Sequence, residues 1–141
     1  FDRAFRTNVY AMFYLCRAAV PIMQPGSSII NTASIQAYQP DFSLLPYAST
    51  KGAIVTFTKA LAKEVIKRGI RVNAVAPGPV WTPLIPSTMP DERVEEFGKS
   101  APISRPAQPV ELAPIFVLLA SREASYMTGD VYGVAGGLLL A

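Results

Sequence analysis

The sequence contains no histidine and a single cysteine, Cys16. Without histidine, catalysis by a Ser-His-Asp triad or a Cys-His pair is excluded, and so are the common histidine-ligated metal sites. One cysteine cannot form an internal disulfide, which fits the reducing cytoplasm. We therefore expect a cytoplasmic protein without a bound metal, in which Cys16 serves core packing rather than nucleophilic attack.

Charged residues are also scarce, at 16% of the chain, whereas half of the residues are hydrophobic. This composition excludes a disordered segment and is typical of a globular domain with a substantial core. The net charge is +3, but the basic residues are scattered, so a nucleic-acid-binding face is poorly supported. Prolines, a glycine and serines interrupt the uncharged stretch 18–40, and the apolar tail 131–141 is short, so we expect no membrane span.

Hydrophobic pattern and turn residues divide the chain into alternating helices and strands. We expect helices over residues 2–23, 46–68 and 109–122, and strands over 28–33, 70–76 and 130–134. The proline-rich stretch 79–108 is interpreted as a lid-like loop with one short helix near 92–98. Alternation at this spacing implies right-handed crossovers and a parallel sheet with helices on both faces, which is an α/β fold.

This α/β unit looks incomplete. Three strands make a thin sheet, and the first helix is apolar on nearly every side between Val9 and Leu15, so a sheet and a second subunit are expected to cover it. The chain also begins at Phe1, inside this helix, rather than at a methionine. We therefore expect residues 1–141 to be the C-terminal part of one domain whose N-terminal half is missing. Alone, this part would expose the edge of the first strand and tend to aggregate.

Tyr47 and Lys51 are separated only by small residues. Four residues along a helix place two side chains on one face, about one turn apart. An ammonium near a phenol favours the phenolate and lowers the tyrosine pKa from about 10 toward neutral pH, so the phenol can donate a proton to a carbonyl or accept one from an alcohol. Alone, the pair is weak evidence, because an ordinary surface pair of this spacing arises readily by chance.

Residues elsewhere in the chain strengthen the catalytic interpretation of this pair. Ser34 lies 13 residues before Tyr47, directly after the first predicted strand, and the turn 77–82 follows the second strand. The carboxyl ends of parallel strands line the ligand crevice of open α/β sheets. Two strand ends and one helix start are therefore expected to meet in one region.

Together, these motifs resemble the short-chain dehydrogenase/reductase family over essentially all of the chain. The motifs are Asn8, Ser34, Tyr47-Ala-Ser-Thr-Lys51, residues 73–84 (NAVAPGPVWTPL) and Tyr126-Met-Thr-Gly129. The resemblance implies the C-terminal, catalytic half of a Rossmann-type doubly wound parallel sheet, with about three strands and flanking helices. It also implies an NAD- or NADP-dependent oxidoreductase that transfers a hydride between a nicotinamide and an alcohol or carbonyl substrate.

The resemblance assigns catalytic roles to four residues. Tyr47 is the general acid/base, and Lys51 lowers its pKa and hydrogen-bonds the nicotinamide ribose. Ser34 holds and polarises the substrate carbonyl, as in oxyanion stabilisation. Asn8 holds a water that connects Lys51 to bulk solvent.

Cofactor and substrate contacts follow from the same resemblance. Pro77 and Gly78 let the backbone approach the nicotinamide ring, and Val80 and Thr82 contact its carboxamide. Gln36 is a further candidate for substrate contact, beside Ser34 and Tyr47. The family's glycine-rich turn and the region that distinguishes NAD from NADP lie upstream of the matching part, so both cofactors stay open.

The resemblance also bears on how the protein assembles and on which other functions stay open. The family commonly forms tetramers through helices equivalent to 2–23 and 47–68, which implies a homo-oligomer, either a dimer or a tetramer. Ala135 stands where the family usually has an acidic or amide residue before two glycines, so a polar role there is in doubt. The alternative is a non-catalytic Rossmann-like binding or oligomerisation module. Double-bond reduction is less favoured, because enoyl reductases of the superfamily space the tyrosine and lysine more widely.

Overall fold

A parallel sheet of three strands forms the centre of the structure, a computed structural model that describes residues 1–138 and 140. The strands are β1 (Ser28–Thr32), β2 (Arg71–Pro77) and β3 (Val131–Val134), in the order β1-β2-β3. All pairings are parallel, with Ile30 opposite Asn73 and Val75 opposite Tyr132. The predicted α/β fold with about three parallel strands is confirmed, and each strand lies within one residue of its expected bounds.

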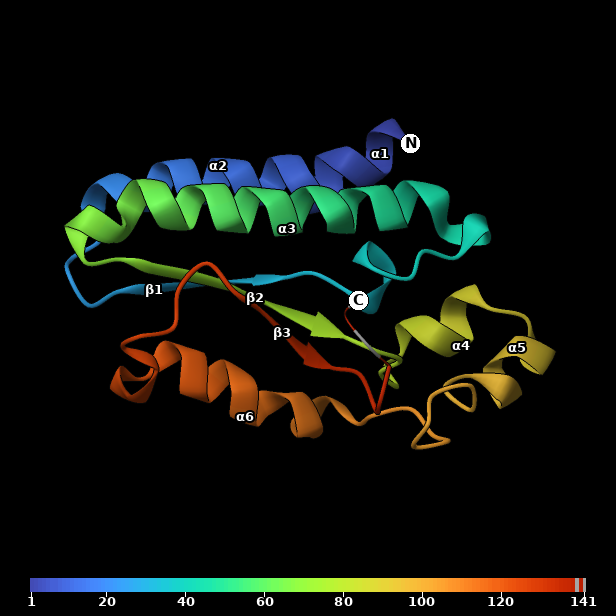
Figure 1. The fold of residues 1–141 in the computed structure, drawn as a ribbon. Coiled ribbons are helices and arrows are strands. Elements are labelled where there is room, and N and C mark those ends of the chain that lie inside the picture. The colour runs from blue at the N-terminus through green and yellow to red at the C-terminus, as the bar shows by residue number, and fades with distance from the viewer. Residues whose placement is uncertain (139, 141) are drawn as a thin grey trace.

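Helices cover both faces of the sheet (Figure 1). The long helix α3 (Leu45–Val65) packs on one face, and α6 (Pro109–Ala120) packs on the other. Ile54 of α3 contacts a buried cluster with Ala74 and Ala76 of β2, whereas Val75 of the same strand points to the opposite face and packs near α6. Alternation of side chains along β2 thus supplies both halves of the core, which is why the strand is apolar almost throughout.

The first helix lies beside α3 and runs from Asp2 to Ile22 with changes in winding (Figure 1). It comprises α1 (Asp2–Phe5), a π-helical turn η1 (Arg6–Tyr10), α2 (Ala11–Ala19) and a 3-10 turn η2 (Val20–Ile22). The extended backbone of Met23 ends it just after Pro21, as the helix-breaking property of proline predicts. Asn8 lies within the π-helical turn, a deviation that is frequent at functional sites.

Short helical turns occupy the connections. η3 (Ile35–Ala37) and η4 (Phe42–Leu44) lie between β1 and α3, η5 (Ile66–Arg68) extends α3, and η6 (Arg122–Ala124) follows α6. The proline-rich stretch contains α5 (Asp91–Glu96), near the expected short helix, and also α4 (Leu84–Thr88), which was not expected. Both lie beyond the carboxyl ends of the strands in Figure 1, where a lid over a site would be placed.

Three properties of the described residues bear on function. No helix within them is long and apolar enough to cross a membrane. No three histidine, cysteine, aspartate or glutamate side chains among them gather closely enough to hold a metal ion. β1 forms one edge of the sheet, and the first helix leaves Tyr14 and Leu15 exposed, so a large apolar surface has no cover within this part of the chain.

Candidate active site

Ser34 lies just past the carboxyl end of β1, where the backbone turns into η3. Its extended backbone makes it the N-cap of that turn, and its Oγ accepts a hydrogen bond of 3.2 Å from the Gln36 backbone N–H. The side chain is nearly buried, at 7% exposure. Because a hydroxyl that accepts one bond keeps its own hydrogen, Ser34 remains able to donate to a substrate oxygen.

Tyr47 and Lys51 lie on the same side of α3, as the spacing predicts. The Lys51 Nζ is 5.3 Å from the centroid of the Tyr47 ring. Tyr47 is partly exposed in the first turn of the helix, whereas Lys51 is buried at 9% exposure. A phenol that is reachable by substrate is thus placed beside an amine that is largely shielded from water.

Lys51 is held by the main chain of the neighbouring strand. Its Nζ donates a hydrogen bond of 2.9 Å to the backbone carbonyl of Thr32, the last residue of β1. Burial lowers the pKa of the Lys51 amine below its usual value of 10.5, because desolvation disfavours the charged form. One N–H of the ammonium is therefore committed to β1, and its remaining donors are available to other partners.

Asn8 reaches this site through Thr50. Its Nδ2 donates to the Thr50 Oγ1 over 3.0 Å, and that hydroxyl donates in turn to the Tyr47 backbone carbonyl over 2.6 Å. Asn8 and Lys51 line one groove between the first helix, β1 and α3. Asn8 and Lys51 therefore border the same groove, and the Asn8 amide bonds to Thr50.

Within residues 1–138 no hydrogen bond joins the Ser34 and Tyr47 hydroxyls. The two residues belong to segments that contact each other, because η3 packs against α3. Gln36 of η3 uses its side-chain oxygen to accept a hydrogen bond of 2.7 Å from the Asp41 backbone N–H. That bond links two parts of the loop between β1 and α3.

The segment after β2 is fixed in an extended form by the lid. Trp81 N–H donates to the Ala107 carbonyl, Ala107 N–H donates to the Pro79 carbonyl, and Val80 is thereby bridged in parallel to Ala107. In a parallel bridge the central residue directs its own N–H and C=O away from the partner. Val80 therefore presents one donor and one acceptor on the opposite side.

Glycine at position 78 is required by close packing. A Cβ at Gly78 would lie 2.8 Å from the Ala135 Cα, closer than side chains approach backbone atoms. Ala135 follows β3, so the ends of β2 and β3 are in contact just beyond Pro77. Thr82 begins the next turn, where its carbonyl accepts the Ile85 N–H.

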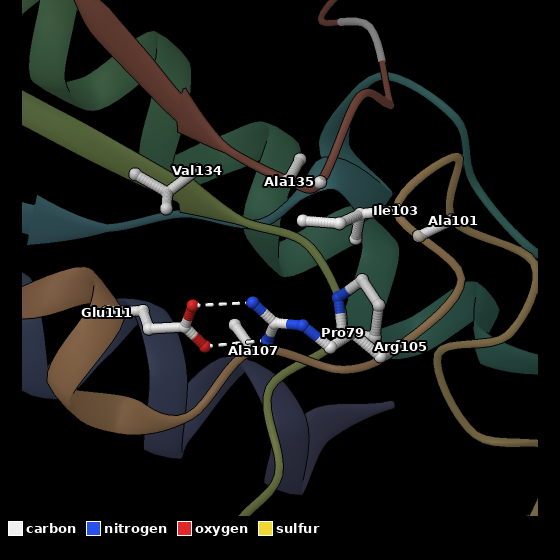
Figure 2. A pocket seen from close by; sticks show the side chains of 9 residues that line it. Pro79, Ala101, Ile103, Arg105, Ala107, Glu111, Val134 and Ala135 are labelled. Carbon is white, nitrogen blue, oxygen red and sulfur yellow. Dashed lines mark hydrogen bonds and ion pairs between the residues drawn. The ribbon is translucent and has the colours of Figure 1, made fainter.

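A small hollow lies next to this segment, and Figure 2 shows an ion pair among the residues that line it. Arg105 makes two hydrogen bonds of 2.8 Å to the Glu111 carboxylate, which also accepts the Gln108 backbone N–H at the start of α6. These bonds, the Arg105 contribution being the largest, lower the pKa of Glu111 to about 2. The pair connects the end of the lid to α6 and is partly exposed.

Two other polar residues prove structural. Asn73 is fully buried in β2, donates to the Met127 carbonyl over 2.7 Å and accepts the Asp130 N–H over 3.2 Å, so its side chain satisfies two backbone groups. Cys16 is buried, and burial raises the pKa of its thiol, so the reactive thiolate is disfavoured.

The sequence analysis missed Thr50 and the Thr32 carbonyl. Thr50 lies inside the recognised Tyr-x-x-x-Lys unit and was regarded only as a small spacer. Its position three residues after Tyr47 on a helix was a usable signal, because threonine hydroxyls often bond a carbonyl three or four residues back. The carbonyl of Thr32 had no signal, since every residue carries one.

Comparison with known proteins identifies the family. The sequence profile described as enoyl-(acyl carrier protein) reductase matches residues 1–139, and the fold superimposes closely on solved dehydrogenases and reductases of the short-chain type. The chain belongs to the short-chain dehydrogenase/reductase family. It spans about half the length of the curated members of the family that it matches.

Three members of the short-chain dehydrogenase/reductase family show how similar this chain is to relatives with different names. Glucose and ribitol dehydrogenase of Daucus carota is 51% identical over 99% of this chain and 48% of its own length. The structure of L-sorbose reductase from Gluconobacter frateurii, complexed with NADPH and L-sorbose, matches with a TM-score of 0.86 and 39% identity over 96% of this chain and 57% of that one. A 3-oxoacyl-(acyl carrier protein) reductase of Brucella melitensis with bound NAD matches with a TM-score of 0.82 and 37% identity over 99% and 52%.

Proposed function

We propose that the protein is an NAD- or NADP-dependent oxidoreductase that interconverts an alcohol and a carbonyl compound, with Tyr47 as general acid/base. The observation that carries the proposal is the Lys51 amine 5.3 Å from the Tyr47 ring, with the amine bonded to the last residue of β1. This arrangement gives a partly exposed phenol a buried cationic neighbour. The family assignment independently supports oxidoreductase chemistry.

Proton transfer is the task of the protein's own side chains. In the reductive direction the Tyr47 hydroxyl donates its proton to the substrate oxygen, and in the oxidative direction the same oxygen accepts the proton of the alcohol. The neighbouring Lys51 ammonium stabilises negative charge on the phenolic oxygen during the transfer. The Ser34 hydroxyl donates to the same substrate oxygen and stabilises the charge that develops there.

Asn8 supports the replacement of the transferred proton. It lines the groove that also contains Lys51. A water held near the Asn8 backbone in the π-helical turn would connect the ammonium to solvent. The Lys51 donors that are not used by Thr32 are the groups that such a water, or a ribose hydroxyl, would meet.

The residues present fit a nicotinamide nucleotide. Val80 offers one donor and one acceptor on the side away from Ala107, which is the complement of a carboxamide. Pro77, Gly78 and Thr82 would border the ring, and Lys51 would hold the ribose. When bound, the nicotinamide supplies or accepts the hydride. Relatives with NADPH and with NAD support either cofactor.

The substrate is proposed as a small alcohol or ketone that contacts Ser34, Tyr47 and Gln36. Relatives named for glucose, ribitol and sorbose make sugars and polyols the first compounds to test. The donor groups of Ser34 and of the Gln36 amide suit a substrate with several hydroxyl oxygens. A 3-oxoacyl substrate is the second class, favoured by a relative of that name.

The apolar surfaces that no other described residue covers suggest how the protein assembles. We propose that an N-terminal half of the same domain extends the sheet beyond β1, because the chain spans about half of its relatives. Exposed Tyr10, Phe13 and Tyr14 on the first helix suit a homo-oligomeric contact that includes α3. We further propose a cytoplasmic location, with nucleic acid and membranes excluded from the partners.

The test measures NADH and NADPH oxidation by the whole protein with a panel of sugars, ketones and 3-oxoacyl esters. Wild-type activity with at least one carbonyl is expected, and Tyr47→Phe should lower kcat by about 10²-fold or more, the usual contribution of general acid–base catalysis. A 2-enoyl ester belongs in the panel, because the profile is described by that reaction. Binding of cofactor without turnover of any carbonyl would favour the non-catalytic alternative.

A further inference from the structure

Two threonines on the buried face of α3 are held in the same way by asparagines from neighbouring elements. Thr50 accepts the Asn8 Nδ2 over 3.0 Å, and Thr58 accepts the Asn31 Nδ2 over 2.9 Å. Both threonines are fully buried. Asn8 comes from the first helix and Asn31 from β1, so the two pairs fix α3 against two different partners.

The first pair acts on the main chain of Tyr47 itself, whereas the second pair reaches the site only through Asn31, the residue before the Thr32 that holds Lys51. The Thr50 hydroxyl donates its own hydrogen to the Tyr47 backbone carbonyl over 2.6 Å, and Thr50 is the residue directly before Lys51. Hence one hydroxyl links the π-helical turn of the first helix to the main chain of the tyrosine. Thr58 lies eight residues further along α3, about two turns away.

From this geometry we infer that Thr50 is a positioning residue. It fixes the first turn of α3 against Asn8, and thereby sets where the Tyr47 hydroxyl lies relative to the Lys51 amine and the substrate oxygen. The inference rests on the proposed function. It assigns no contact with substrate to Thr50, which acts through the backbone of Tyr47.

The physical reason is the start of the helix. First-turn residues lack the full set of helical hydrogen bonds, so the orientation of Tyr47 depends on what holds its main chain. Misplacement of a reacting group by about 1 Å can cost about 10²-fold in rate. A buried bond between Asn8 and Thr50 restricts that displacement directly.

The experiment compares Thr50→Val with Thr58→Val in the whole protein. Valine keeps the branched shape and removes the asparagine's partner in each case, so a lower thermal midpoint is expected for both, with the larger drop for Thr50→Val because it also loses the bond to the Tyr47 carbonyl. Thr50→Val should lower kcat about tenfold or more with KM changed less than about threefold, whereas Thr58→Val should keep kcat within about twofold. Thr50→Ser retains the hydroxyl and should restore kcat.

The outcomes separate the inference from the proposed function. Equal kcat values for the two valine variants, or a Thr50→Ser variant as slow as Thr50→Val, would overturn the positioning role while wild-type turnover still supports the function. Wild-type protein that turns over no carbonyl would overturn both. If either valine variant does not fold, Thr50→Ala and Thr58→Ala give the same comparison, because alanine is a strong helix former.

Discussion

Replacement of Lys51 by methionine tests the central pair of the site. Methionine has a similar length and fills the same buried space, but it carries neither a charge nor a hydrogen-bond donor. If Lys51 stabilises the charge on the Tyr47 oxygen, the Lys51→Met variant should lose about 10²-fold or more in kcat, comparable to the loss of general acid–base catalysis. An exposed lysine on the same helix, Lys63, provides the control variant Lys63→Met, which should retain full activity.

Stability should respond in a different way. The substitution removes a hydrogen bond of 2.9 Å to the Thr32 carbonyl, which is worth about 1 kcal/mol net, and it also removes the cost of burying a charge. The variant leaves the Thr32 carbonyl without this donor. We therefore expect the free energy of unfolding of Lys51→Met at pH 7 to lie within about 1 kcal/mol of wild type, because the two terms oppose each other.

The lowered pKa of Lys51 predicts how the stability of the protein changes with pH. The folded-state pKa of Lys51 lies below its unfolded value of 10.5, because burial disfavours the ammonium. The resulting destabilisation is fully present below the folded pKa and is relieved as the pH rises through it toward 10.5. Wild type should therefore gain stability relative to Lys51→Met in alkaline buffer.

The assay combines steady-state kinetics with urea unfolding of the whole protein at pH 7 and in alkaline buffer. A folded Lys51→Met variant with kcat within about threefold of wild type would refute the role of the amine, since general acid–base catalysis contributes far more. A stability difference from wild type that does not change between pH 7 and alkaline pH would refute the burial argument.

Two further substitutions test the frame around the site. Asn73→Ala leaves the Met127 carbonyl and the Asp130 N–H without their buried partner. Urea unfolding should therefore show a free energy of unfolding lower by about 2–5 kcal/mol, with kcat per folded molecule unchanged. A decrease below about 1 kcal/mol would contradict this role. Gly78→Ala places a methyl group 2.8 Å from the Ala135 Cα and should lower the free energy of unfolding by about 1–3 kcal/mol in the same assay. The control is Gly52→Ala in α3, where the methyl meets nothing within 4 Å, and it should be neutral or stabilising. Equal stabilities of the two glycine variants would contradict the packing argument.

Most of the fold could be predicted from the sequence because local signals agreed with each other. Pro46 and Gly69 bracket α3, and the β-branched residues of β2 end at Pro77 and Gly78, so periodicity and turn chemistry favoured the same boundaries. α4 was missed because Pro86 lies inside it and the lid has no clear periodicity. The π-helical turn at Asn8 was missed as well, since its winding depends on packing against α3.

The candidate site could be predicted only in part. The face shared by Tyr47 and Lys51 follows from helix geometry, and it was predicted correctly. The catalytic roles of Asn8, Ser34 and the residues after β2 stay predictions that the experiments above address. What the sequence could not indicate is which backbone atoms serve as partners, because main-chain carbonyls such as that of Thr32 have no residue-specific signature.

The Thr32 carbonyl has a consequence for which residues of the chain can vary. Since Lys51 is fastened to a main-chain oxygen, the amino acid at position 32 is free to change during evolution without altering the amine's location. Because of the same bond, the position of the Lys51 amine depends on the register of β1 in the sheet. A slip of β1 by one residue would displace its carbonyl by about 3.3 Å and turn it toward the other edge, so the Lys51 amine is held beside Tyr47 in this way only when the sheet has its native register.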